Sequence, residues 1–241
     1  MLPTPPPEMV GHVTGNAAYT AEEYRAPGRA CAVEIFNTDV IVTPSAKVLG
    51  IGCGCGRVSQ FILPLLSGDG AYLGLDTWGT GIQWASKNIA TVYPQSSFRS
   101  LGNGDNYDAT SAFPFGVIDG SFDAAIAISL FTHLRKNAAV QYFKQIYNAL
   151  RPGGRAYLTF FANKQRFREC WPEIICDEDD YGIYFVKPEF EDAFLDEGVL
   201  IDTMTRIGFA VAEKRYGYWR GDQYVGRGQA GYQDLFVVER R

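Results

Sequence analysis

The sequence predicts an α/β protein with a doubly wound, mostly parallel sheet, and three observations support this fold class. Short apolar runs that suit buried strands alternate along the chain with segments of helical periodicity, as βαβ units do. The first apolar run, 48–51, leads into a glycine-rich turn and then into a helical pattern. Polar residues follow the ends of several predicted strands, where open parallel sheets bind their ligands.

Length and composition are those of an ordinary globular chain. It has 241 residues, 46% hydrophobic and 20% charged, which is enough for one large domain. A net charge of −5 disfavours a nucleic-acid partner. No run of about twenty apolar residues predicts a membrane span. Because the first residues lack the basic and apolar regions of a signal peptide, we expect a cytoplasmic protein. The oligomeric state is left open, and a homo-oligomer is one alternative.

Residues 1–45 are predicted to form a helical leader or lid before the main domain, 46–241. Its segment 19–36 predicts one or two helices, with a break at Pro27-Gly28. Such a leader must pack over the sheet or over a ligand cleft. Tyr24 or Arg29 could there contact a bound carboxylate, or could serve only in packing.

The glycine-rich turn organises the first predicted βα unit. Its glycines recur at alternate positions, Gly52, Gly54 and Gly56. Glycine allows both a sharp turn and the close approach of a ligand to the backbone. The spacing does not fit the dinucleotide fingerprint, which would need glycine at Cys55 or Arg57, and it does not fit the phosphate-binding loop. Cys53 and Cys55 lie within this turn and the chain has only two histidines, so we expect no metal site.

The later elements follow in order. We predict strands at 71–75, 96–101, 122–128, 156–161, 209–216 and 235–239, and helices at 58–66 and 82–92, around 140–150, and from Pro188. The last two strands are joined by one loop and are therefore expected to be antiparallel. Asp76 ends the second strand, where a carboxylate suits the hydroxyls of a ribose.

Residues 162–186 interrupt the alternation and are interpreted as an insertion. A segment of this length without clear structure is often a lid or a binding segment, and it contains Trp171. Its acidic run, 177–180, could hold a hard cation. A solvated acidic surface is the interpretation that we favour.

The successive motifs resemble those of the class I S-adenosylmethionine (SAM)-dependent methyltransferases, specifically the broad small-molecule group. The resemblance covers about 46–161 and is carried by segments in sequence order: 48–56, 74–76, 104–105, 122–123, 129–134 and 150–154. The closing segment 233–238 resembles the last strand of that group. The resemblance implies a Rossmann-like methyltransferase fold with a seven-stranded sheet whose last strand is antiparallel.

The resemblance also implies a cofactor, SAM, with S-adenosylhomocysteine as the product, and a set of site residues. The cofactor set comprises Gly50, Gly52, Cys53, Gly54, Gly56, Asp76, Thr77, Trp78, Asp105, Asn106 and Ser129. Within it, the glycines would wrap the methionine part, Asp76 would bind the ribose, Asp105 would approach the adenine, and Ser129 would line the cleft floor. The substrate set comprises Trp171, Trp219 and Tyr224, because aromatic residues suit a ring-shaped acceptor.

The chemistry implied is methylation of a small molecule, most simply of a hydroxyl on a sugar or other secondary metabolite, by direct SN2 transfer. A hydroxyl acceptor benefits from a general base. His133 is the best candidate, although a hydrogen-bonding role in its turn is the alternative. Gly50 departs from the family, which has an acidic residue there to order the glycine loop. A catalytically idle SAM-binding scaffold, and a SAM-utilising enzyme that transfers another group, therefore stay as alternatives.

Overall fold

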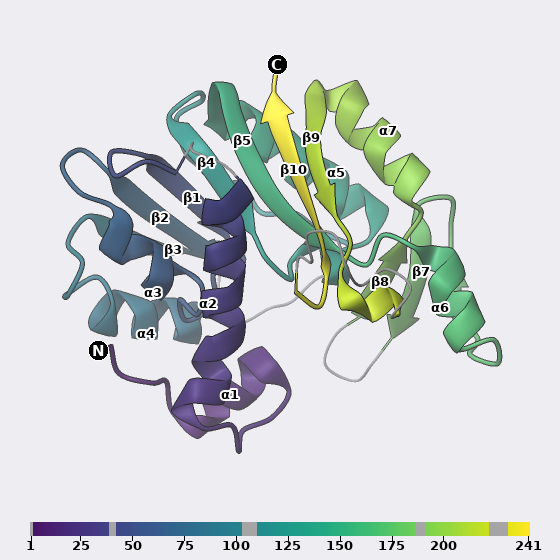
Figure 1. The fold of residues 1–241 in the computed structure, drawn as a ribbon, viewed down its shortest axis with the longest axis horizontal. Helices are drawn as coiled ribbons and strands as arrows, with labels where there is room; N and C mark the ends of the chain where they lie inside the picture. The colour runs from purple at the N-terminus through teal and green to yellow at the C-terminus, as the bar shows by residue number, and fades with distance from the viewer. Residues whose placement is uncertain (1, 39–41, 103–109, 187–190, 222–230) are drawn as a thin grey trace. The chain divides into compact units, whose positions relative to one another are not determined.

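A computed structural model of the chain describes residues 2–38, 42–102, 110–186, 191–221 and 231–241 (Figure 1). The predicted fold class is confirmed. Seven strands form one sheet in the order β3-β2-β1-β4-β5-β10-β9, and β6, β7 and β8 form a second, small sheet. The chain divides into two compact units, residues 1–106 with 122–126 and residues 107–121 with 127–241. Each unit is described by itself below.

The first unit carries the parallel part of the sheet. Its elements are α1 (Pro7–Thr14), α2 (Ala21–Thr38), β1 (Lys47–Ile51), α3 (Ser59–Ile62), the 3-10 turn η1 (Leu63–Leu65), β2 (Ala71–Asp76), α4 (Gly79–Asn88), β3 (Ser96–Ser100) and β4 (Phe122–Ala127) up to residue 126. β1 pairs in parallel with β2 and with β4, and β2 pairs in parallel with β3. These are the first four strands that the sequence predicts. The core between them includes Val48, Leu49, Ile62 and Leu75, all fully buried.

The leader differs from the prediction in two ways. α2 runs through Pro27 without the expected break, and α1, which the sequence did not indicate, begins with Pro7 at its first position. The continuity of α2 has a packing reason. A Cβ at Gly28 would overlap the carbonyl oxygen of Arg57, so this glycine lets the helix lie directly against the end of the glycine turn.

The second unit contains the antiparallel part of the sheet. Its elements are η2 (Phe131–His133), α5 (Lys136–Ala149), β5 (Leu150–Phe160), α6 (Lys164–Cys170), β6 (Asp177–Glu178), β7 (Gly182–Val186), β8 (Glu191–Leu195), α7 (Glu197–Ile207), β9 (Phe209–Arg215), η3 (Tyr218–Arg220) and β10 (Asp234–Arg240). β10 lies between β5 and β9 and is antiparallel to both, as predicted for the last strand (Figure 1). Stacked and tilted rings of Phe131, Phe143 and Phe160 fill the core beside β5.

Two predicted boundaries in this unit are wrong. β5 begins at Leu150, not at 156, because the Arg-Pro-Gly-Gly segment that follows α5 already belongs to the strand. The helix predicted from Pro188 begins at Glu197, where the Asp196 side chain accepts from the Val199 N–H at 3.1 Å as an N-cap. Its predicted start, 188–190, lies outside the described residues, and Glu191–Leu195 forms β8, paired antiparallel with β7.

The segment 162–186, which the sequence predicts to be an insertion, contains α6, β6 and β7. The acidic run is paired with basic side chains, since Asp177 bonds Arg135 at 2.8 Å and Asp180 bonds Lys136 at 2.6 Å. Within the described ranges, no group of three or more His, Cys, Asp or Glu residues could hold a metal ion. The same part of the chain contains no helix long and apolar enough to cross a membrane.

Candidate active site

The glycine turn after β1 has the backbone that only glycine adopts easily. Gly52, Gly54 and Gly56 have φ of 66°, 54° and 82°, in the left-handed region. The N–H groups of Gly52 and Cys53 donate to the Leu75 carbonyl at 2.8 and 3.2 Å, which ties the turn to the end of β2. Among the described residues, a Cβ at Gly54 would meet only Val13, at 3.9 Å. The backbone at this point is therefore open to the approach of a ligand.

Asp76 lies at the end of β2 and is bonded to the same turn. Its Oδ2 accepts from the Gly54 N–H at 2.6 Å and its Oδ1 from the Trp78 N–H at 2.8 Å. Burial raises the pKa of Asp76, and the N–H donors of Trp78, Gly54 and Thr77 oppose the shift. Each carboxylate oxygen has two acceptor lone pairs, so both can still accept from a pair of hydroxyls.

Two further groups that the sequence did not single out lie by Asp76. Ser100 faces Asp76 in the β2–β3 register, and its hydroxyl is buried with no hydrogen-bond partner among the described residues. From the leader, the His12 ring stacks on Trp78 with 4.1 Å between the ring centroids. An orphaned hydroxyl beside a carboxylate, with a flat aromatic wall close by, is a suitable lining for a nucleoside.

The leader contacts the glycine turn through the buried side chain of Tyr24 and not through the exposed side chain of Arg29. The hydroxyl of Tyr24 lies 3.1 Å from Cys55 Sγ, and both residues are buried. Arg29 instead pairs on the surface with Glu22 at 3.0 Å. Of the remaining predicted cofactor residues of this unit, Asp105 and Asn106 lie outside the described residues.

In the second unit, the segment after β4 is held in an uncommon conformation. Ser129 has φ 58°, which is strained for a residue other than glycine. Its N–H donates to Thr159 Oγ1 at 2.8 Å, and its hydroxyl bonds the side chain of Gln233 at 3.1 Å. Strain that the surroundings maintain in this way is often found at functional sites. Gln233 belongs to the closing segment noted in the sequence, but its contact with Ser129 joins residues far apart in the chain.

His133 is fixed by a strand of the small sheet. Its Nδ1 lies 2.8 Å from the Glu191 carbonyl oxygen and 3.4 Å from Asp192 Oδ1. A carbonyl oxygen can only accept, so Nδ1 carries the proton and Nε2 is the nitrogen with a lone pair. The side chain is 29% exposed. A base oriented by a carboxylate and a carbonyl matches the geometry of catalytic histidines.

The predicted substrate residues Trp171 and Trp219 both contact one hydrophobic cluster, made by Phe161, Phe167, Ile183 and Phe194. Trp219 meets Phe161 edge-on with 5.1 Å between centroids, and Trp171 lies 6.1 Å from Phe194. The indole N–H of Trp219 is buried without a partner in the described part of the chain. The third predicted residue, Tyr224, lies outside it.

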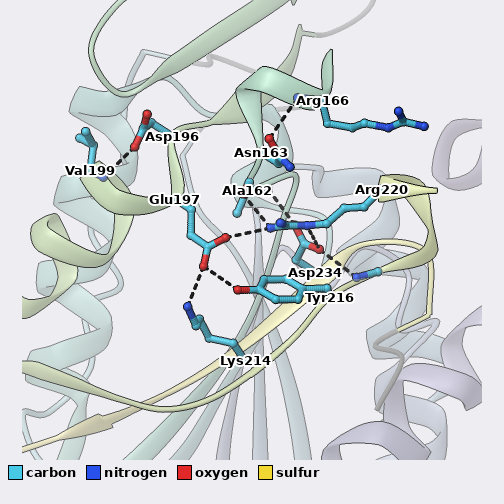
Figure 2. A network of polar contacts seen from close by, with 11 residues as sticks. Ala162, Asn163, Arg166, Asp196, Glu197, Val199, Lys214, Tyr216, Arg220 and Asp234 are labelled. Carbon is cyan, nitrogen blue, oxygen red and sulfur yellow. Dashed lines mark hydrogen bonds and ion pairs between the residues drawn. The ribbon is translucent and has the colours of Figure 1, made fainter. Parts of the chain in front are cut away.

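A buried ion network holds the segment that carries Trp219 (Figure 2). Asp234, which is fully buried, accepts from Arg220 Nε at 2.8 Å and from the Gly217 N–H at 2.8 Å. Glu197 joins Arg220 to Lys214 and Tyr216. Although burial raises the pKa of Glu197, the hydrogen bonds from Lys214 and Tyr216 bring it below its usual value.

Comparison with known proteins agrees with this geometry. Residues 48–154 match the model of a methyltransferase domain. A SAM-dependent methyltransferase from Methanosarcina mazei is 18% identical, with a TM-score of 0.60 over 86% of this chain and 96% of that one. A protein from Haloferax volcanii, solved in complex with the Trm112 methyltransferase activator, is 16% identical, with a TM-score of 0.62 over 97% and 94% of the two chains. A SAM-dependent methyltransferase from Mesorhizobium loti is 13% identical, with a TM-score of 0.58 over 88% and 98%. At these identities the structural likeness shows the fold.

Proposed function

Because the chain belongs to the class I SAM-dependent methyltransferases, we propose that it methylates a hydroxyl group of a small, ring-shaped acceptor. SAM is the cofactor of this family. The single observation that carries the hydroxyl assignment is the orientation of His133, whose Nδ1 is held by the Glu191 carbonyl at 2.8 Å. A hydroxyl is a poor nucleophile until it loses its proton, whereas a neutral amine or a thiolate needs no such base.

The residues of the first unit fit the cofactor. The turn at Gly54 offers open backbone to the methionine part, and Asp76 offers two acceptor oxygens to the ribose hydroxyls. Ser100 adds a buried hydroxyl without a partner among the described residues. When bound, SAM supplies a methyl group already activated by the positive sulfur. The protein then mainly has to align the acceptor with that group.

The residues of the second unit are assigned to the acceptor. His133 takes the hydroxyl proton at Nε2, while Asp192 and the Glu191 carbonyl keep the ring oriented. Ser129, whose backbone is strained and whose hydroxyl bonds Gln233, is the residue that we assign to the floor of the acceptor site. Trp171 and Trp219 provide flat apolar surface for a ring.

The experiment is a methyl-transfer assay with SAM and a panel of phenols, sugars, amines and thiols, with the products identified by mass spectrometry. For the hydroxyl acceptor that is methylated, His133→Gln should lower kcat by about 10²–10⁴-fold and leave the Kd for SAM near the wild-type value. Asp192→Asn should give a smaller loss of kcat, because it removes only one of the two groups that orient the ring. Methylation of amines or thiols alone, or full activity of His133→Gln, would contradict the proposal.

A second candidate comes from the likeness to the Haloferax volcanii protein, which extends over 97% of this chain. In that candidate the chain works with an activator protein. The purified chain alone decides between the two. If it binds SAM and methylates small molecules by itself, no activator is needed. If it turns over only when co-purified with a second protein, the activator-dependent candidate is supported.

A further inference from the structure

The side chain of Arg135 contacts all three strands of the small sheet. Its Nε and Nη2 donate to the two carboxylate oxygens of Glu191 in β8, each at 2.8 Å. The same Nη2 donates to Asp177 of β6 at 2.8 Å. The guanidinium also lies over the ring of Tyr184 in β7, with 4.8 Å between its Cζ and the ring centroid. One side chain, placed directly before α5, therefore fastens β6, β7 and β8 together.

The strand register places these three partners on one face of the small sheet. Asp177 is the register partner of Tyr184, and Glu191 is the register partner of Val186. Tyr184 and Val186 are two residues apart in β7, and such residues point to the same face of a sheet. The face therefore presents two carboxylates and an aromatic ring. A planar guanidinium with a fork of N–H donors suits this surface, whereas the single ammonium of a lysine does not.

The outer edge of β8 faces the turn that carries His133. β8 ends the strand order β6-β7-β8, so one of its edges is left for groups outside the small sheet. At that edge the Glu191 carbonyl accepts from His133 Nδ1 at 2.8 Å, and the Leu195 N–H donates to the Phe161 carbonyl at 2.7 Å. Asp192 Oδ1 lies 3.4 Å from the same Nδ1. These two acceptors at Nδ1 are both supplied by β8, so both depend on where that strand is held.

Partial burial makes the pair with Glu191 the stronger of the two ion pairs of Arg135. The side chains of Arg135 and Glu191 are 29% and 17% exposed, whereas that of Asp177 is 66% exposed. Bidentate charge-assisted bonds fix distance and orientation together, but a single exposed pair contributes little. Without the guanidinium, the Glu191 carboxylate would be left poorly solvated and without its cation, which is costly. We expect the end of β8 then to shift toward water, and its carbonyl with it.

We propose that Arg135 is a positioning residue for His133. By fixing the Glu191 side chain, it holds the Glu191 carbonyl at Nδ1, so that the proton stays on Nδ1 and the lone pair on Nε2. This inference rests on the assignment of His133 as the general base made above. Arg135 acts through Glu191 and β8 and takes no part in the proton transfer itself. A ring released from β8 would exchange between its two tautomers, and only one of them presents a lone pair at Nε2.

The first test measures the tautomer of His133 by NMR and needs no acceptor. The chain has two histidines, so the long-range proton–nitrogen spectrum of His12→Gln assigns each ring. Where the ring is neutral, the wild type should show the Nδ1–H tautomer. Arg135→Met and Glu191→Gln should instead show an average of the two tautomers. Lys136→Met is the matched control and should keep the wild-type spectrum, because this neighbouring lysine pairs at 2.6 Å with Asp180, which lies outside β8.

The second test measures kcat with the acceptor that the wild type methylates. Arg135→Met and Glu191→Gln should each lower kcat by about 10- to 100-fold, the scale of misplacing a catalytic group by about 1 Å. The Kd for SAM should stay near the wild-type value, because the cofactor residues belong to the first unit. Arg135→Lys should recover only part of the loss, since it keeps the charge without the fork. Lys136→Met should retain wild-type kcat.

A double variant separates positioning from general stability. Arg135→Met combined with His133→Gln should be no slower than His133→Gln alone, because no base is left to position. A further loss in the double variant would overturn the inference, as would the wild-type tautomer in Arg135→Met. If Arg135→Met does not fold, Glu191→Gln decides by the same two measurements, since it keeps the backbone carbonyl and the side-chain shape. Wild-type kcat in His133→Gln would instead refute the base assignment, and the tautomer measurement would still decide whether Arg135 orients the ring.

Discussion

Replacing Asp234 by alanine should destabilise the second unit strongly. The Asp234 carboxylate is fully buried at the start of β10 and accepts from the Ala162 N–H at 2.9 Å, the Gly217 N–H at 2.8 Å and the Arg220 guanidinium at 2.8 and 3.0 Å (Figure 2). Without it, two buried N–H groups lose their acceptor. The Arg220 side chain is only 5% exposed, and in the variant its guanidinium would still donate to the Ala162 carbonyl and to Glu197, the contacts drawn in Figure 2.

The expected loss is about 3–5 kcal/mol in the free energy of unfolding, which is the scale of removing one partner of a buried ion pair. For a chain of this length, that loss corresponds to a fall in melting temperature of roughly 6–20 °C. The control is Glu239→Ala on the same strand. Glu239 pairs with Arg155 at 2.8 Å, with side chains 33% and 28% exposed. Because solvent screens such a pair, this variant should lose at most about 1 kcal/mol.

Urea unfolding followed by circular dichroism, with a thermal scan beside it, measures both variants. Arg220→Met combined with Asp234→Leu should recover much of the loss, since apolar groups of similar volume remove the uncompensated charge. If Asp234→Ala cost no more than Glu239→Ala, the network would not stabilise the segment, and the reasoning would be refuted.

Four further outcomes are expected. Asp76→Ala should weaken SAM binding by roughly 1.5–3 kcal/mol, or about 10- to 150-fold in Kd by calorimetry, and unchanged affinity would contradict the ribose assignment. Gly54→Val should abolish SAM binding, because φ is 54° and the added side chain would enter the open approach; a folded variant that bound normally would disprove this. Folding lowers the pKa of Glu197, so the ionised carboxylate stabilises the folded protein fully above its unfolded pKa of about 4.5. This stabilisation is lost as the pH falls through the lower pKa of the folded state. On acidification, the melting temperature of the wild type should therefore fall more than that of Glu197→Gln. Trp219→Ala removes a ring packed on Phe161 and should lower the melting temperature; a raised KM for the acceptor at unchanged SAM affinity would in addition place the ring in the acceptor pocket, and wild-type acceptor kinetics would exclude it.

The sequence was sufficient where the determining residues are neighbours in the chain. The strand at 48–51, the glycine turn and Asp76 were predicted because apolar runs, glycines and a strand-end acid are local signals. The parallel order of β1, β2 and β3 then follows from the helices between the strands. The antiparallel direction of the last strand in the sheet was predicted from the family resemblance. An apolar segment alone does not show whether a strand runs parallel or antiparallel to its neighbours.

Sequence reasoning failed where a distant contact decides the structure. Pro27-Gly28 signals a break, yet α2 continues because Gly28 lets it approach the backbone of Arg57. Residues 191–195 form a strand only because β7 pairs with them. The Tyr72 side chain from β2 fills the space that a side chain at Gly50 in β1 would need, so nothing near Gly50 in the sequence indicated this contact.

The two units hold their functional segments by different kinds of interaction, and this has a consequence for assays. The glycine turn of the first unit is held by two backbone N–H groups that donate to the Leu75 carbonyl and by the Ser59 hydroxyl, which donates to the Gly56 carbonyl at 3.2 Å. His133 of the second unit depends on the Glu191 carbonyl, and the Glu191 carboxylate is itself held by Arg135 through two bonds of 2.8 Å. Ion pairs at partly exposed positions weaken with salt, whereas hydrogen bonds between neutral groups do so little. Raising the ionic strength should therefore lower kcat, through the orientation of His133, before it weakens the binding of SAM.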